Sequence, residues 1–241
     1  MTDKVVVITG AGTGIGRATA LAFAELGADV VAVGRRPGPL GEIAGGRIRA
    51  LPADITVDAR RVVDTVVEWF GRVDVVVNNA GIVASGALES VAAEDVAAQL
   101  ETNLVAPIKL TQAALPHLPE GGVVVNVSTA IGQRGWPGNS VYSATKAALD
   151  SITRSWTVEF APRGIRVVAV APGAVETPIA DHQGLTQEQR REVRAWQIAH
   201  TPLGRVAAPE EVAWAITRLA SPEASFVTGV VLPVDGGAVV A

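Results

Sequence analysis

The sequence predicts an α/β fold in which a single sheet of mostly parallel strands carries helices on both faces. Short runs rich in Val and Ile alternate with stretches of helical periodicity, and this alternation is typical of βαβ units. The runs are apolar almost throughout, as expected of strands that are buried on both faces. A glycine-rich turn closes the first run and opens the first helical stretch. No linker or repeat divides the chain, so we expect one domain over residues 1–241.

The composition excludes several classes of protein. Hydrophobic residues make up 49% of the chain and charged residues 18%, which is enough apolar material for a sizeable core. The net charge of −4 offers no basic field for nucleic acid, and the absence of cysteine excludes disulfides, thiolate catalysis and cysteine–metal sites. No apolar run approaches the ~20 residues of a membrane helix. The N-terminus lacks a signal-peptide pattern, so we expect a soluble cytoplasmic protein.

The elements follow one another in regular order. Strands are predicted at residues 4–8, 29–33, 48–52, 73–77, 123–127, 165–170 and 227–234. Helices are predicted at residues 17–26, 57–70, 92–118, 140–160, 187–198 and 209–219, with room for little more than one turn at 37–46. Pro107 and Pro116 lie within the third of these helices, so we expect a kink or a break there. Asn139 and Ser140 are available to cap the fourth.

Tyr142 and Lys146 are the predicted centre of the chemistry. Tyr142 is the only tyrosine, and Lys146 follows four residues later on a predicted helix, where both side chains share one face. A free phenol titrates near ~10. A neighbouring ammonium favours the phenolate and lowers the pKa of the phenol, which suits general acid/base work. An isolated Y-x-x-x-K is usually incidental on a surface helix, so this interpretation depends on the rest of the chain.

The turn after the first strand is predicted to bind the pyrophosphate of a dinucleotide. Residues 9–16 read TGAGTGIG between a strand and a helix. In this arrangement backbone N–H groups can approach a pyrophosphate at the positive end of the helix. Such glycines can also be simple tight-turn residues, but the flanking strand and helix favour nucleotide binding.

The end of the second predicted strand favours NADP over NAD. Folds that take NAD usually place a carboxylate here to hold the 2′-hydroxyl of the ribose. This chain has Arg35 and Arg36 instead, and a guanidinium offers a bidentate partner to a 2′-phosphate. The alternative is that one or both arginines are solvated loop residues. Asp54 and Ile55 follow the third strand and are expected to edge the adenine pocket.

Other polar stretches fall where ligands bind in such sheets. Residues 78–81, with the sequence NNAG, close the fourth strand. Asn103 is disfavoured inside a helix, which indicates a buried polar role. Residues 179–206 are polar, lack a strand pattern and are the candidate substrate lid.

Side chains near this predicted lid have open interpretations. Trp136 and Trp196 either line an apolar pocket or pack the lid. Gln133 and Arg134 are expected at the same cleft, and our hypothesis is that Arg134 favours an anionic substrate. His182 and His200 have neither the spacing nor the setting of ligands, so no metal site is predicted.

Taken together, these stretches resemble the short-chain dehydrogenase/reductase family over essentially the whole chain. The matching residues are 9–16, 78–81, Asn103, Tyr142 with Lys146, 172–173 and 234–237. The resemblance implies a doubly wound Rossmann-type sheet of seven strands in the order 3-2-1-4-5-6-7. It also implies a homotetramer or homodimer, packed partly through the Tyr142 helix and the last strand.

The resemblance further implies roles for individual residues. Tyr142 would exchange a proton with the substrate oxygen, and Lys146 would lower its pKa and hold the nicotinamide ribose. Asn103 would anchor a water that links Lys146 to solvent. The other residues implied to contact the cofactor are Gly10, Thr13, Gly14, Ile15, Gly16, Asn79, Ala80, Gly81, Pro172, Gly173, Val175 and Thr177.

One position departs from the family pattern. The family usually has a Ser thirteen residues before the Tyr to orient the substrate, whereas this chain has Thr129 there, after Ser128. Gly132 supports this register. Thr has the same donor and acceptor capacity, although its β-methyl group restricts χ1. We expect Thr129 to orient the substrate and Ser128 to be structural; the alternative is a weakened enzyme.

The expected function is hydride transfer between a nicotinamide cofactor, preferably NADP, and a ketone or secondary alcohol. Tyr142 is expected to act as the general acid/base. One alternative is an epimerase-type reaction on the same cofactor, although the C-terminal part is short for that group. Another is a non-catalytic dinucleotide sensor or scaffold, which the presence of Tyr142, Lys146 and Asn103 disfavours. The residues do not identify the ketone or the physiological direction.

Overall fold

The fold is organised around a seven-stranded, wholly parallel sheet. The computed structural model describes residues 1–133, 138–179 and 186–241. The strand order β3-β2-β1-β4-β5-β6-β7 confirms the predicted topology. The order reverses between β1 and β4, and ligands bind at the carboxyl ends of strands beside such a reversal. The strands are β1 Val5–Thr9, β2 Asp29–Gly34, β3 Ile48–Pro52, β4 Val75–Asn78, β5 Val123–Val127, β6 Arg166–Pro172 and β7 Val231–Val234.

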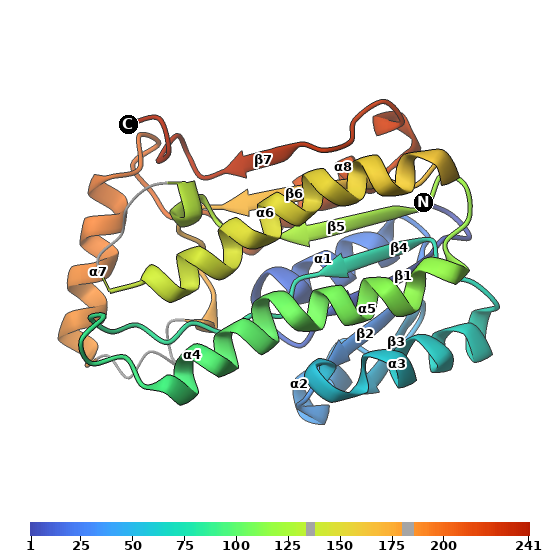
Figure 1. Ribbon diagram of the computed structural model, residues 1–241, viewed down its shortest axis with the longest axis horizontal. Helices are drawn as coiled ribbons and strands as arrows, with labels where there is room; N and C mark the ends of the chain where they lie inside the picture. Colours follow the sequence, from blue (N-terminus) through green and yellow to red (C-terminus); the bar gives the residue numbers. More distant parts are fainter. Residues whose placement is uncertain (134–137, 180–185) are drawn as a thin grey trace.

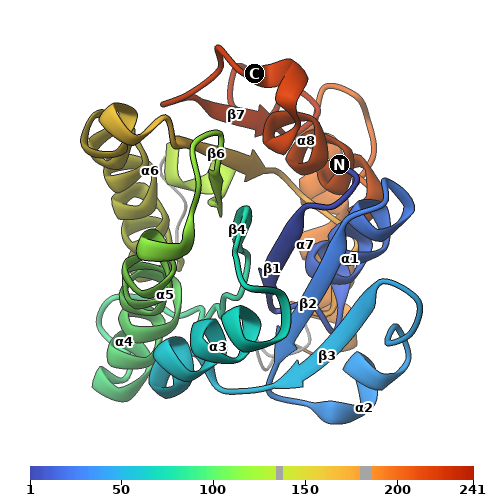
Figure 2. The ribbon, with the colours of Figure 1, turned by 90° about the vertical axis from the view of Figure 1, so that its right-hand side faces the viewer.

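Helices cover both faces of this sheet (Figure 1). Viewed along the strands, α5 and α6 lie on one side and α1 and α8 on the other (Figure 2). The main helices are α1 Gly14–Glu25, α2 Pro37–Gly41, α3 Ile55–Phe70, α4 Ala93–Leu100, α5 Ala106–Ala114, α6 Ser140–Phe160, α7 Gln187–Ala199 and α8 Pro209–Ala220.

Successive residues of a buried strand belong to different hydrophobic cores. In β1, Val5 and Val7 pack in the core under α3 and α5, whereas Val6 and Ile8 pack in the core under α1 and α8. Because each face needs its own apolar side chains, the strand sequence is apolar throughout rather than alternating. This is the physical reason for the continuous Val and Ile runs.

The long helical region is interrupted near both of its prolines, as predicted. After α4, a single π-helical turn spans Glu101–Val105, and Pro107 lies in the first turn of α5. Proline has no N–H, so the carbonyl of Asn103 has no donor four residues on, and a wide turn accommodates the ring. A 3₁₀ turn at Leu115–His117 contains the second proline.

The amino-terminal edge of the sheet is fastened by one buried carboxylate. Asp74, 2% exposed, accepts hydrogen bonds from the Val5 N–H at 3.0 Å, Lys4 Nζ at 3.0 Å and Arg72 Nη2 at 2.6 Å. The main chain of Asp74 also bonds to Val5 and Val123. This cluster joins the starts of β1, β4 and β5 at the end of the sheet opposite to the predicted site.

Two boundaries differ from the sequence-based expectation by three residues or more. The last strand begins at Val231 rather than near residue 227, because a 3₁₀ turn at Pro222–Ala224 and the left-handed Gly229 (φ 72°) turn the chain first. The first helix begins at Gly14, inside the glycine-rich turn. Within the described ranges, no helix is both long and apolar enough to cross a lipid bilayer.

Candidate active site

A large cavity opens along the carboxyl edge of the sheet. Its volume is about 1150 Å³, and it runs from the glycine-rich turn and the end of β2 to Tyr142 on α6, with α7 on its wall. Gly16 and Asn103 are not on the wall. The structure brings the other predicted residues to this cavity: Gly10, Thr13, Gly14, Ile15, Arg35, Arg36, Asp54, Ile55, Asn79, Ala80, Gly81, Thr129, Tyr142, Lys146, Pro172, Gly173, Val175 and Thr177.

The glycine-rich turn presents the start of α1 to the cavity. Thr13 is the N-cap residue but makes no side-chain cap bond, so it leaves the first N–H groups of α1 for another acceptor. Gly16 has a packing role, because a Cβ there would lie 2.3 Å from the Gly10 carbonyl oxygen and 2.5 Å from Asn79 Nδ2. The turn therefore needs glycine for close packing as well as for ligand approach.

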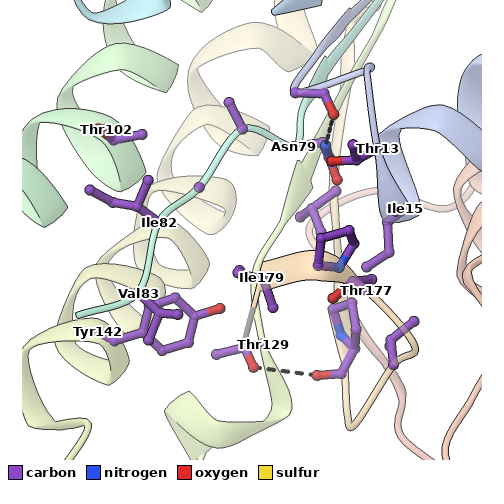
Figure 3. A pocket seen from close by; sticks show the side chains of 18 of the residues that line it. Thr13, Ile15, Asn79, Ile82, Val83, Thr102, Thr129, Tyr142, Thr177 and Ile179 are labelled. Atoms are coloured by element: carbon purple, nitrogen blue, oxygen red, sulfur yellow. Dashed lines mark hydrogen bonds between the residues drawn. The ribbon is translucent and has the colours of Figure 1, made fainter. Parts of the chain in front are cut away.

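Thr9 fixes the two strand ends that border this turn, a role that sequence reasoning missed. Its hydroxyl accepts the N–H groups of Asn79 at 3.0 Å and Ala80 at 2.9 Å, and Asn79 Nδ2 donates to the Thr9 carbonyl at 2.8 Å. These hydrogen bonds hold the ends of β1 and β4 together beside the cavity (Figure 3). The only available signal was the position of Thr9 at the head of the glycine motif.

The end of β2 carries two exposed guanidinium groups and no carboxylate. Arg35 and Arg36 line the cavity and are exposed. Asp54 also lines it, but its carboxylate caps α3 by accepting the N–H of Thr56 at 3.0 Å and its hydroxyl at 2.7 Å. The acidic side chain nearest to the predicted adenine pocket is therefore already engaged within the protein.

Tyr142 and Thr129 project into the cavity beside Ile82 and Val83 (Figure 3). Burial raises the pKa of Tyr142 to about 12, and hydrogen bonding with the Thr129 hydroxyl acts in the opposite direction. The Thr129 hydroxyl also lies 3.3 Å from the Pro172 carbonyl oxygen, to which it donates. The sequence predicted a lowered pKa for this phenol. In the structure desolvation dominates, so that expectation was wrong for this arrangement.

Lys146 is anchored on the main chain at the foot of the same wall. Its side chain is 3% exposed, and Nζ donates to the Val127 carbonyl at 2.8 Å. Burial lowers the pKa of Lys146 to about 8, while the charge of Asp150 raises it. A Cβ on Gly81 would lie 3.4 Å from this ammonium, so glycine leaves it room beside the loop after β4.

Asn103 lies behind this cluster, and its side-chain amide makes three hydrogen bonds. Oδ1 accepts the Ile82 N–H at 2.9 Å, and Nδ2 donates to the Ile82 carbonyl at 2.9 Å and to Thr145 Oγ1 at 3.2 Å. The amide therefore ties the loop after β4 to α6. A water bound by Asn103, as the family resemblance implies, would contact either the second lone pair of Oδ1 or the main-chain carbonyl.

Helix α7 covers the cavity and is tied to the segment after β6. Arg194 forms an ion pair with Glu176, while Val193, Trp196 and Gln197 line the cavity. Trp196 stacks on His200 with a centroid distance of 3.9 Å, and His200 Nδ1 lies 2.8 Å from the Trp196 carbonyl oxygen. The predicted helix at residues 187–198 is confirmed.

The expectations for the cap of α6, for three side chains near the predicted lid and for a metal site have separate outcomes. Asn139 is the N-cap residue of α6, but its side chain accepts from Ser85 Oγ at 2.9 Å instead of capping the helix. Arg134, Trp136 and His182 lie outside the described residues. In the described part of the chain, no cluster of three or more His, Asp or Glu side chains is arranged to hold a metal.

Comparison with known proteins agrees with this geometry. A family model described as enoyl-(acyl carrier protein) reductase matches residues 10–239. A solved short-chain dehydrogenase/reductase of the glucose/ribitol dehydrogenase type from Brucella melitensis superposes with a TM-score of 0.92 at 35% identity, covering 99% of this chain and 97% of that one. The chain belongs to the short-chain dehydrogenase/reductase family and is an oxidoreductase of that type.

Particular relatives carry more specific names. The 3-oxoacyl-[acyl-carrier-protein] reductase FabG of Thermotoga maritima is 40% identical, with 98% of each chain covered. The cis-4-hydroxycyclohexanecarboxylate dehydrogenase of Sinomonas cyclohexanicum is 41% identical, covering 98% of this chain and 96% of that one. A 3-ketoacyl-(acyl-carrier-protein) reductase from Brucella melitensis, solved with NADH, has a TM-score of 0.90 at 35% identity, with 99% of each chain covered.

Proposed function

We propose that the protein is a ketone reductase that prefers NADP(H), with Tyr142 as the general acid. The observation that carries this proposal is the continuity of one cavity, which joins the start of α1, the arginines after β2 and the Thr129–Tyr142–Lys146 cluster. The uncapped N–H groups of α1 fit a pyrophosphate. The nicotinamide supplies the hydride, and the protein supplies orientation and the proton.

The protonation state of Tyr142 suits reduction. With a pKa raised to about 12, the phenol keeps its proton at neutral pH and can donate it to a carbonyl oxygen. The Lys146 ammonium would stabilise the phenolate that remains.

The test of the proposed function is NADPH oxidation, followed by absorbance, with a panel of ketones. Tyr142→Phe should abolish turnover while leaving NADPH binding intact. Full activity in this variant would reject Tyr142 as the acid, and cofactor binding without any turnover in the wild type would favour the sensor alternative.

Thr129 is proposed to orient the substrate oxygen. Its hydroxyl reaches both the phenol and the wall of the cavity formed by Pro172. A hydroxyl between these groups can hydrogen-bond to a carbonyl oxygen that receives the Tyr142 proton. Ser128 also borders the cavity and is as buried as Thr129, with 3% and 5% exposure, but it is proposed to be structural.

The cofactor preference is proposed from the charges at the end of β2. Arg35 and Arg36 are exposed on the cavity wall, where each can pair with a 2′-phosphate. The Brucella relative was solved with NADH, so the two cofactors need direct comparison. We expect a higher kcat/KM with NADPH than with NADH; equal values or a preference for NADH would refute the assignment.

The substrate is proposed to be a ketone carried on a largely apolar body. The cavity walls near Tyr142 include Ile82, Val83, Ile131, Val193 and Trp196. The names of the Thermotoga and Sinomonas relatives describe a 3-oxoacyl thioester and a ring alcohol, which share the interconversion of a ketone and a secondary alcohol. A 3-oxoacyl thioester and 4-oxocyclohexanecarboxylate are therefore the first substrates to compare.

Assembly into a homodimer or homotetramer is proposed through α6 and the β7 region. Val158 on α6 is 75% exposed, Trp214 on α8 is 62% exposed, and Phe226 before β7 is fully exposed. Exposed aromatic side chains such as Trp214 and Phe226 belong to the types enriched at protein interfaces, which supports this proposal. Light scattering on the purified protein tests this proposal, and a monomer at micromolar concentration would contradict it.

A further inference from the structure

A buried carboxylate on α6 has no role in the mechanism described so far. Asp150 is 7% exposed, and its Oδ1 has no hydrogen-bond partner in the described part of the chain. The Ser128 hydroxyl oxygen is also buried without a partner that meets hydrogen-bond geometry. Burying an ionisable group with incomplete hydrogen bonding costs stability, so packing alone does not explain a carboxylate here.

Asp150 belongs to a row of polar side chains that leads to the catalytic tyrosine. Tyr142, Lys146, Asp150 and Arg154 follow one another at intervals of four on α6, so they share one face of the helix. Side chains on a helix lean toward its N-terminus, which directs the Asp150 carboxyl toward the level of Lys146. Ser128, at the end of β5, interacts with Asp150 from the sheet side.

The charge of Asp150 acts on the pKa of the Lys146 ammonium. Its one hydrogen bond in the described structure goes to a neutral acceptor, the Val127 carbonyl. Two influences act on the pKa of Lys146: burial, which lowers it to about 8, and the Asp150 charge, which raises it. The groups that act on Asp150 itself are Ser128, Arg154 and Lys146, and burial raises the pKa of this carboxyl.

We propose that Asp150 is a positioning residue for the Tyr142–Lys146 pair: its buried carboxylate, one helical turn below Lys146, keeps the ε-ammonium charged and seated on the Val127 carbonyl. The consequence for catalysis rests on the proposed function. A charged Lys146 stabilises the phenolate that remains after Tyr142 gives up its proton, whereas a neutral amine does not. Asp150 therefore sets the pH range over which the pair operates.

The direct test is titration of Lys146 by NMR in the full chain without substrate. The sequence contains three lysines, Lys4, Lys109 and Lys146, so a protein labelled with ¹³C at lysine Cε gives few signals. Lys4 and Lys109 pair with Asp74 and Glu101 at 3.0 and 2.7 Å, and neither pair involves α6. In the wild type, one signal should titrate near pH 8.

Asp150→Asn should lower the midpoint of that signal by at least one pH unit, because the buried cation loses its neighbouring negative charge. Glu159→Gln is the matched control: it removes one exposed negative charge from the last turn of the same helix and should leave the midpoint in place. Asp150→Glu keeps the charge and should retain most of the wild-type midpoint. An unchanged midpoint in Asp150→Asn, or an equal shift in Glu159→Gln, would overturn the proposal.

Turnover provides a second and separable readout. The limb of the kcat/KM profile that reports the Tyr142–Lys146 pair should move in Asp150→Asn in the same direction as the NMR midpoint, with little change in the KM for the ketone. An unmoved limb with a moved midpoint would reject the catalytic part of the proposal. If the wild type reduces no ketone, the proposed function fails while the NMR result still decides whether Asp150 and Lys146 are coupled.

Discussion

The side chain of Asn103 pairs with both backbone groups of Ile82, as a neighbouring strand would. Its Oδ1 accepts the Ile82 N–H, and its Nδ2 donates to the Ile82 carbonyl, each at 2.9 Å. The loop after β4 is therefore held by Thr9 of β1 at its start and by the π-helical turn at Ile82. Since that loop borders both the proposed ribose site and Lys146, Asn103 contributes to the site by placing backbone.

Asn103→Ala should destabilise the protein markedly. The change leaves the partly buried N–H and C=O of Ile82 without their partners, and each fully buried unsatisfied group costs about 1–3 kcal/mol, so we expect a loss of about 2 kcal/mol in the free energy of unfolding. Urea denaturation measures it. Asn139→Ala, which removes an exposed bond to Ser85, is the control and should cost about 0.5 kcal/mol. Similar losses for both variants would contradict the assigned role.

Gly16→Ala should be far more damaging than Gly38→Ala. A Cβ at Gly16 would lie 2.3 Å from the Gly10 carbonyl oxygen, whereas one at Gly38 meets nothing within 4 Å. Forcing the turn apart should cost about 1–3 kcal/mol and weaken NADPH binding. Thermal melts and fluorescence titration with NADPH measure the two effects. A Gly16→Ala variant that binds NADPH as tightly as Gly38→Ala would argue against the tight turn.

Thr129→Ala should lower kcat about 100-fold, the usual effect of losing one donor to the reacting oxygen. Thr129→Ser keeps the hydroxyl and should retain most of the activity. Ser128→Ala tests the neighbouring position and should have a much smaller effect on kcat. A larger loss in Ser128→Ala than in Thr129→Ala would exchange the roles of the two residues.

Replacing Arg35 and Arg36 together by Ala should raise the KM for NADPH by about 10–100-fold, because each charge-assisted hydrogen bond contributes about 1.5–3 kcal/mol before solvent screening. The KM for NADH should change little, since NADH has no 2′-phosphate. Steady-state kinetics with both cofactors measure the difference. Equal increases for NADPH and NADH would show that the arginines serve another part of the cofactor.

Tyr142, which is half-buried, and Lys146, which is buried, should leave a signature in the pH dependence of stability. The pKa of Lys146 falls from 10.5 to about 8 in the folded chain, so the unfolded chain binds more protons in that window and stability rises with pH. The pKa of Tyr142 rises from 10.0 to about 12, so stability falls with pH in that higher window.

Urea unfolding at pH 7.5 and 9.5 tests the Lys146 part. The wild type should gain stability between these values relative to Lys146→Met, which cannot titrate. At still higher pH, Tyr142→Phe should lose less stability than the wild type. A parallel pH dependence of the wild type and Lys146→Met would mean that Lys146 is not desolvated as the structure indicates.

The sequence predicted most elements because their signals are local, whereas the sheet order followed from the family resemblance. Apolar runs mark the strands, and Gly71 marks the end of α3 in the left-handed conformation (φ 73°). The prolines likewise predicted the interruption of the long helix, and the π-helical turn at that interruption contains Asn103. These features depend on residues that are adjacent in the sequence, so they can be predicted from the sequence alone.

The rest of the site depends on contacts between distant segments. The raised pKa of Tyr142 follows from burial in the folded protein, and the isolated helix pattern predicted the opposite direction. The link between Ser128 and Asp150 joins β5 to α6, and the bond between Asn139 and Ser85 joins two loops. No spacing rule within a single element predicts such pairs.

The buried carboxylate of Asp74 stands at the opposite end of the sheet from Tyr142. Its bonds to Lys4, Arg72 and the start of β1 hold the strands together where no residue of the proposed site lies. Engineering can therefore treat the two ends separately. Substitutions around Asp74 should change heat tolerance and leave the kinetic constants alone, so this end is the place to adapt the protein to harsher conditions.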